Sequence, residues 1–226
     1  IDFDAGLANA HLLLDIAPAH DLGHLMTGSV PLFEAIADGP GGLKLLSGGV
    51  GRHALANPTR RELERLFRAL VPAEEDFDLI VIDHGAGMSY GTVAHLAATS
   101  TLILVTSHEV TGLSDAYAIY KRALMVNPHI KVGVVVNRAP NEATAFAAWE
   151  RFRSACQRFL QASPELIDWV PADEAVSKSI EHRIPVSKLL PDSQAARALQ
   201  RIAEWPALDL ARTSSAFYER ALRALR

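Results

Sequence analysis

Short, mostly apolar runs alternate with helical patterns along nearly the whole chain. The apolar runs fall at 1–4, 43–49, 77–87, 101–107, 130–139 and 166–173. Apolar residues recur every three or four positions, as in amphipathic helices, at 60–70, 91–100, 112–128, 143–161 and 193–205. A strand that is apolar throughout needs cover on both faces, and helices between such strands provide it. The pattern therefore predicts an α/β fold with a mostly parallel sheet flanked by helices on both faces.

Composition narrows the classes of protein that this chain can represent. Its 226 residues are 49% hydrophobic and carry a net charge of −4, which favours a sizeable core and disfavours direct binding of nucleic acid by bulk charge. Cys156 is the single cysteine, so no intrachain disulfide is possible and a reducing compartment fits. No apolar run approaches the roughly 20 residues of a membrane-spanning helix. We therefore expect a cytoplasmic protein.

Polar residues follow several of the predicted strands. They are Asp2, Asp4, Asp83, Asn137 and Asp173. Ligands of parallel α/β sheets bind beyond the carboxyl ends of the strands, where these side chains would gather. Strands also end at polar residues for no functional reason, but several aspartates beside a glycine-flanked turn exceed that expectation. The pattern favours a nucleotide or metal–phosphate site.

The segment DLIVIDHGAG (78–87) has the form of a Walker B strand, in which apolar residues lead to an acid. Asp83 would hold Mg²⁺ through a water molecule, since oxygen ligands suit this hard cation. Gly85 and Gly87 would let phosphates approach the backbone. The pattern alone is equally compatible with an aspartate that caps the following helix.

Five segments in order give the chain a more specific resemblance. They are DFDAGLAN (2–9), DHGAG (83–87), VTSHEVTGLSDAYAIYK (105–121), VVVNR (134–138) and VPADEAVSKSIEHRIPV (170–186). Together they resemble the MinD/ParA group of deviant Walker ATPases, and within it the FlhG (FleN) flagellar-number regulators. The resemblance covers about residues 1–205, and the segment EVTGLSDAYAIYK points to the flagellar branch.

Transferred residue by residue, the resemblance implies roles near the phosphates for three aspartates. Asp4 matches the acid that positions or activates the attacking water, and Asp2 matches its neighbour near Mg²⁺ and the switch region. Asp83 matches the Walker B aspartate. The residues that the resemblance implies at the adenine base are Asn137, Arg138, Pro171 and Asp173. A carboxylate at a strand end can orient water toward a γ-phosphate, where positioning supplies most of the catalysis.

The chain contains no G-x-x-x-x-G-K-[ST] phosphate loop. The segment GGVGRHA (48–54) is similar to part of one, but Arg52 and His53 stand where Lys and Ser or Thr would be needed. In the family, the first strand and the loop precede the D-x-D segment, so we expect them upstream of Ile1. Without them, the chain as given should bind ATP poorly, because the cradling N–H groups and the lysine are missing.

The resemblance implies a switch that binds ATP, ADP and Mg²⁺ and forms an ATP-dependent homodimer. Its expected partners are an FlhF-type GTPase or a transcriptional regulator of flagellar genes. A second hypothesis is a degenerate adaptor without nucleotide chemistry, which the replacement of the usual Thr by His84 favours; His108 likewise replaces the usual Pro. A third is a ParA-type partitioning ATPase, which the acidic net charge disfavours.

Residues 213–226, TSSAFYERALRALR, form a basic amphipathic pattern after a predicted ATPase domain at 1–212. Phe217, Tyr218, Ala221, Leu222 and Leu225 share one arc of a helix, opposite arginines. Such a helix can lie in a lipid interface, as the resemblance implies for the inner face of the cell membrane. It can equally pack on its own domain as an ordinary terminal helix.

Overall fold

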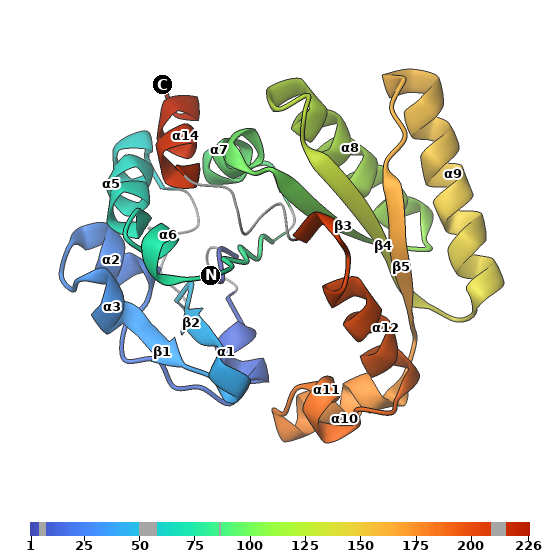
Figure 1. Ribbon diagram of the computed structural model, residues 1–226, viewed down its shortest axis with the longest axis horizontal. Coiled ribbons are helices and arrows are strands. Elements are labelled where there is room, and N and C mark those ends of the chain that lie inside the picture. The colour runs from blue at the N-terminus through green and yellow to red at the C-terminus, as the bar shows by residue number, and fades with distance from the viewer. Residues whose placement is uncertain (5–7, 50–57, 86, 209–215) are drawn as a thin grey trace. The chain divides into compact units, whose positions relative to one another are not determined.

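The computed structural model describes residues 1–4, 8–49, 58–85, 87–208 and 216–226, and the chain divides into two compact units (Figure 1). The first unit comprises Ile1–Ala98 together with Ser214–Arg226, and the second comprises Thr99–Thr213. The predicted boundary between residues 212 and 213 lies outside the described residues. Each unit has its own helices and strands.

The second unit is built on a parallel sheet of three strands in the order β3-β4-β5. These strands span Thr101–Ser107, Lys131–Ala139 and Glu165–Pro171. Its helices are α8 (Val110–Val126), α9 (Glu142–Leu160), α10 (Glu174–His182), α11 (Val186–Leu189) and α12 (Gln194–Ala203). The predicted α/β fold with a parallel sheet is therefore confirmed, and the elements predicted in this half begin and end within a few residues of their predicted positions.

Successive residues of a strand point to opposite faces of the sheet, so these apolar strands present apolar side chains on both faces. Helices pack on both of them. Val135 packs with α12 residues Ala198 and Ile202 in one buried cluster. On the other parity, Val134 and Val136 are fully buried, and α8 and α9 pack against β3, β4 and β5. The fully apolar strands predicted from the sequence therefore have the two-sided cover that they need.

The first unit is mostly helical. Its helices are α1 (Ala10–Leu13), α2 (Leu22–Thr27), α3 (Leu32–Ala35), α5 (Arg60–Leu70), α6 (Ala73–Asp76), α7 (Tyr90–Ala98) and α14 (Phe217–Ala224), with a 3-10 turn at Pro40–Gly42. Strands β1 (Ile36–Asp38) and β2 (Lys44–Leu46) pair antiparallel. The sequence predicted β2 within 43–49, but not its antiparallel partner.

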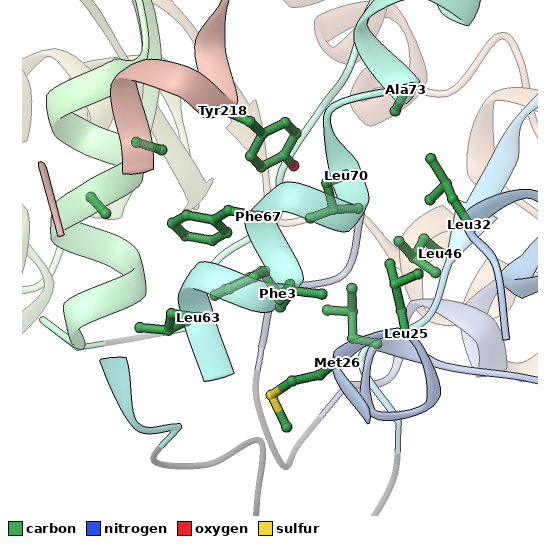
Figure 2. Close-up of a cluster of buried hydrophobic side chains, with 14 of the residues drawn as sticks. Phe3, Leu25, Met26, Leu32, Leu46, Leu63, Phe67, Leu70, Ala73 and Tyr218 are labelled. Atoms are coloured by element: carbon green, nitrogen blue, oxygen red, sulfur yellow. The ribbon is translucent and has the colours of Figure 1, made fainter. Parts of the chain in front are cut away.

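Helix α5 organises the core of the first unit. Thr59 begins it with a capping box, in which its hydroxyl accepts from the Glu62 N–H and Glu62 reaches back to the Thr59 N–H. Its four periodic apolar residues, Leu63, Leu66, Phe67 and Leu70, are at most 1% exposed. Figure 2 shows Leu63, Phe67 and Leu70 beside Phe3, Tyr218 and residues of α2 in this cluster.

The predicted strand at 77–87 is not formed as such. Within its described residues, the structure has one isolated parallel bridge, between Asp83 and Asp2. Residues 78–82 have the apolar composition of a strand, but no strand pairs with them among the described residues. The prediction was wrong for most of this segment because a strand exists only where a neighbour completes its hydrogen bonds.

The C-terminal helix α14 packs on the first unit. Tyr218 and Ala221 are fully buried against α5 and α7, and Leu225 is nearly so. Glu74 accepts hydrogen bonds from the N–H groups of Phe217 (2.9 Å) and Tyr218 (2.7 Å) and so caps the helix. The apolar arc predicted from the sequence is therefore covered by protein in this structure. No helix among the described residues is both long and apolar enough to cross a membrane.

Candidate functional site

The carboxyl end of the segment Ile1–Asp4 lies beside the end of the Walker B segment in the first unit. The Asp83 N–H donates to the carbonyl of Ile1 (2.8 Å), and the Phe3 N–H donates to the carbonyl of Asp83 (2.7 Å). On its other edge, the Asp2 N–H donates to the carbonyl of Leu46 in β2 (3.0 Å). These ladder bonds bring the D-x-D aspartates and Asp83 together at one edge.

Asp2 is 2% exposed, and its carboxylate binds backbone. Its Oδ1 accepts from the Asp4 N–H (3.2 Å), and its Oδ2 accepts from the Ala10 N–H (3.1 Å). The same carboxylate therefore binds the backbone of Asp4 and of Ala10, the first residue of α1. In this structure Asp2 therefore positions Asp4, and its oxygens are already used by protein donors.

Asp4 and Asp83 present the negative charge of this edge. Gly85 makes room for Asp4, because a Cβ at position 85 would lie within 2.6 Å of the Asp4 Cγ. The pKa of Asp83 is raised, first by loss of hydration at this edge and then by repulsion from Asp2 and Asp4. A cation placed here would relieve this repulsion.

The donor set at this edge fits a magnesium ion held mainly through water and phosphate. Carboxylate oxygens are the ligands that Mg²⁺ prefers, and it commonly takes only one or two of them from a protein. Within the described ranges, no group of three or more histidine, cysteine or acidic side chains is arranged to hold a metal ion by itself. The carboxylates at this edge, Asp4 and Asp83, are therefore of a chemical type that fits such an ion.

The residues predicted at the base lie in the second unit. Asn137 is paired with Ser107 of β3 and Val170 of β5 at the carboxyl end of the sheet. Arg138 follows in the left-handed region (φ +57°), and the β4–β5 register shifts between Asn137 and Ala139. Pro171 is buried opposite Ala139. Asn137, Arg138 and Pro171 therefore lie together at the carboxyl end of β4 and β5. The left-handed backbone of Arg138 is uncommon for a residue other than glycine.

Asp173 has a structural task in the second unit. It is the N-cap of α10, where its Oδ1 accepts from the Ala175 N–H (2.9 Å), and its Oδ2 accepts from the Ala195 N–H of α12 (3.0 Å). These backbone hydrogen bonds lower the pKa of its carboxyl group. One carboxylate thereby fixes the starts of two helices next to the predicted base loop.

The glycines differ in how much the structure supports their predicted roles. Gly85 lies against the Asp4 carboxylate, and Gly87 is exposed with φ +133°, a conformation that glycine tolerates best. The turn predicted in GGVGRHA (48–54) falls partly on residues 50–57, which lie outside the described residues.

His95 is a buried polar residue beside the site that the sequence did not indicate. Its Nδ1 lies 3.0 Å from the Nε2 of His84, and its ring contacts Phe3 and Phe67, each with 4.7 Å between ring centroids. Burial lowers the pKa of His84 to about 4. Burial, and then the neighbouring His84, lower the pKa of His95 well below its usual range. His84, a departure from the family pattern, therefore packs as a neutral residue behind Asp83.

We expect the first unit to lose stability as the pH falls below 6.5. The unfolded state then binds protons that the buried His84 and His95 do not bind. Each of these histidines therefore lowers the free energy of unfolding by about 1.4 kcal/mol per pH unit. Urea unfolding at pH 7, 6 and 5 measures this slope. His95→Phe should flatten it; an unchanged slope in that variant would contradict the assignment. The raised pKa of Asp83 acts in the opposite sense.

No family model matches the chain. Among curated proteins, it is 26% identical over 210 residues to the antiactivator FleN of Pseudomonas aeruginosa, covering 91% of this chain and 75% of FleN. It is 24% identical over 205 residues to the flagellum site-determining protein YlxH of Helicobacter pylori, covering 89% and 68%. These matches confirm the resemblance predicted from the sequence motifs.

Among solved structures, the chain is similar to the septum site-determining protein MinD of Pyrococcus horikoshii, which was solved as a complex with Mg-ADP. The TM-score is 0.71 at 22% identity, over 90% of this chain and 80% of that one. This likeness confirms the fold, an α/β architecture of the MinD type.

Proposed function

We propose that this chain is the core of a MinD-type ATPase switch that regulates flagellar number or placement. It has the fold of MinD and is similar in sequence to FleN and YlxH. ATP, ADP and Mg²⁺ are its proposed ligands. The proposal concerns a form of the protein that carries a phosphate-binding loop, because residues 1–226 contain none.

One observation carries the proposal: Asp2, Asp4 and Asp83 meet at one edge, each with a different environment. Asp2 is buried, and its carboxylate accepts hydrogen bonds from the backbone. The pKa of Asp83 is raised by loss of hydration and by its charged neighbours. The Asp4 carboxylate lies against Gly85, where a side chain would collide with it. In the proposed site, Asp83 holds Mg²⁺, which neutralises phosphate charge when bound. Asp4 orients the attacking water, and Asp2 holds Asp4 in place.

Asn137 and Arg138 are proposed to contact the adenine base, with Pro171 closing over it. Their position at the carboxyl end of β4 and β5 supports this assignment, since ligands of such sheets bind there. Asp173 is proposed to act indirectly, because both of its oxygens cap helices.

The dimer, the partners and the membrane belong to the same proposal. We infer an ATP-dependent homodimer and an FlhF-type GTPase or flagellar transcriptional regulator as partner, on the strength of the similarity to FleN and YlxH. Membrane contact through α14 would require its apolar arc to leave α5 and α7 first.

The proposal predicts Mg²⁺-dependent binding of ATP and dimerisation in a form that carries the phosphate loop. Residues 1–226 alone should bind ATP at least about tenfold more weakly, because no N–H cradle holds the phosphates. Calorimetry and light scattering with ATP, with and without Mg²⁺, measure both effects. Asp83→Asn should weaken the Mg²⁺ dependence.

The same experiment separates the proposal from the adaptor hypothesis. If the looped form neither binds ATP nor dimerises with Mg²⁺, while remaining folded, the proposed switch is wrong. A protein that has kept the fold without nucleotide chemistry would then take its place.

A further inference from the structure

Three aromatic rings pack together beside the carboxylate edge, as we call the place where the D-x-D segment meets Asp83. They are the rings of Phe3, His84 and His95, with 4.7 to 5.2 Å between their centroids. Phe3 is the middle residue of the D-x-D segment, and His84 directly follows Asp83. His95 belongs to α7 and is 4% exposed. Through one buried ring, this helix therefore contacts both segments that carry the carboxylates.

Helix α7 holds both ring nitrogens of His84. The Nε2 atom of His84 lies 3.0 Å from the Nδ1 atom of His95, and its Nδ1 atom lies 3.4 Å from the Oγ1 atom of Thr92, a weaker contact. Thr92 and His95 are three residues apart on one helix face, so both reach the same ring. The hydroxyl of Ser89 in turn binds the N–H (3.1 Å) and the hydroxyl (2.9 Å) of Thr92. The ring of His84 is therefore fixed in orientation as well as in place.

The two histidines are joined by a hydrogen bond between neutral rings. Burial lowers the pKa of both, so neither is charged at pH 7. Of the two facing nitrogens, one must then donate and the other accept. The remaining nitrogen of His95, Nε2, is buried without a hydrogen-bond partner in the described part of the chain, and a buried N–H without an acceptor is rare in proteins. His95 therefore carries its hydrogen on Nδ1 and donates from there to Nε2 of His84.

The carboxylate edge carries charges that repel one another. Loss of hydration, and then repulsion from Asp2 and Asp4, raise the pKa of Asp83. Two backbone hydrogen bonds join the segments that bear these charges. Helix α7 adds direct packing, since a Cβ at Gly91 would lie 2.8 Å from the Phe3 ring. A further bond from α7 to the residue after Asp83 opposes separation of the two segments.

We propose that His95 and His84 are positioning residues for the carboxylate edge: the N–H···N bond between them locks the end of the Walker B segment onto α7 and keeps Asp83 beside the D-x-D segment. His84 stands where the family pattern has Thr, so this histidine lock belongs to this chain and not to that pattern. The use of the positioned carboxylates for Mg²⁺ and water rests on the proposed function, whereas the lock itself does not.

NMR of residues 1–226 with ¹⁵N-labelled histidine tests the bond at pH 7. We expect scalar coupling between Nδ1 of His95 and Nε2 of His84 across the hydrogen bond. We also expect the hydrogen of His95 on Nδ1 and none on Nε2. Absence of the coupling would overturn the proposal, and so would a His95 that carries its hydrogen on Nε2.

Two replacements of His95 separate positioning from packing. His95→Phe keeps a buried ring and removes a buried polar group, so the first unit should stay as stable or gain stability. His95→Asn keeps an N–H near the position of Nδ1 but leaves a cavity, so stability should fall. The readout is the exchange rate of the Asp83 and Phe3 amides relative to that of Leu66 in α5. We expect this ratio to rise at least about tenfold in His95→Phe and to stay within about threefold in His95→Asn.

The opposite pattern would overturn the proposal. If the ratio is unchanged in His95→Phe, or rises more in His95→Asn than in His95→Phe, His95 is a packing residue only. Neither the NMR nor the exchange experiment involves nucleotide, so both test the lock independently of the proposed function.

A third measurement connects the lock to the site. In a form that carries a phosphate-binding loop, His95→Phe should raise the Mg²⁺ concentration for half-maximal ATP binding about tenfold, the lower end of the loss when a group that orients a metal ligand is removed. An unchanged Mg²⁺ requirement with normal ATP binding would overturn the positioning role. If the unaltered looped form binds no ATP, the proposed function fails, while the NMR and exchange results still decide the lock.

Discussion

Replacing Asp4 with alanine, in a form of the protein that carries a phosphate-binding loop, should slow ATP hydrolysis at least about tenfold while ATP binding and dimerisation persist. Asp4 stands at the carboxylate edge over Gly85, and its N–H is held by Asp2. The variant would lose the carboxylate that we propose orients water but would keep Asp83, the proposed Mg²⁺ ligand. Phosphate release under single-turnover conditions and nucleotide titration measure the two effects separately.

Two variants sharpen this prediction. Asp76→Ala removes an exposed carboxylate of the same unit, and should leave turnover unchanged. Gly85→Ala keeps Asp4 but introduces a Cβ into its carboxylate, so it should mimic Asp4→Ala. Near-normal turnover in Asp4→Ala would remove Asp4 from the mechanism and leave the edge a cation site alone.

The elements that sequence reasoning located well are those whose signal is local. Helix α5 begins and ends at the predicted residues because a capping box and four periodic apolar residues define it without reference to the rest of the chain. Strands β3 and β4 are similarly marked by apolar runs too dense for a surface element. The apolar run of β4 also places Asn137 near the carboxyl end of that strand.

The predictions that failed or were incomplete depend on partners distant in sequence. The segment 78–82 has a strand composition, but its strand needs a neighbour that no local pattern contains. The family resemblance does not indicate that Asp173 caps α10 and also binds the start of α12, 22 residues further along the chain. The buried position of His95 could not be predicted, because the sequence of α7 does not indicate that its ring packs against Phe3 and Phe67.

Tyr218→Ala should destabilise the first unit by about 3–5 kcal/mol, the cost of emptying a fully buried aromatic site. Tyr218 packs 5.7 Å from Phe67 between ring centroids, in the cluster that unites α5, α7 and α14 (Figure 2). Urea unfolding of residues 1–226 measures the loss. The sequence pattern of α14 fits a lipid surface or a protein core equally well, and this variant reports how strongly the core holds it.

Tyr218→Phe is the matched control, because the buried hydroxyl has no hydrogen-bond partner in the described structure. Its removal should leave stability unchanged or raise it by about 1 kcal/mol. A large loss in this variant would mean that the hydroxyl is bonded in solution and that the packing described for α14 is wrong.

Glu74→Ala extends the test to the membrane without altering the helix itself. Ala216 at the N-cap of α14 offers no side-chain acceptor, so Glu74 alone satisfies the N–H groups of Phe217 and Tyr218 among the described contacts. Its loss should weaken docking by about 1–2 kcal/mol. If α14 is a membrane anchor held in reserve, the variant should sediment with anionic vesicles more than the unaltered chain does. If it unfolds more easily yet does not bind the vesicles, α14 is a structural helix of the first unit, held by its packing on α5 and α7.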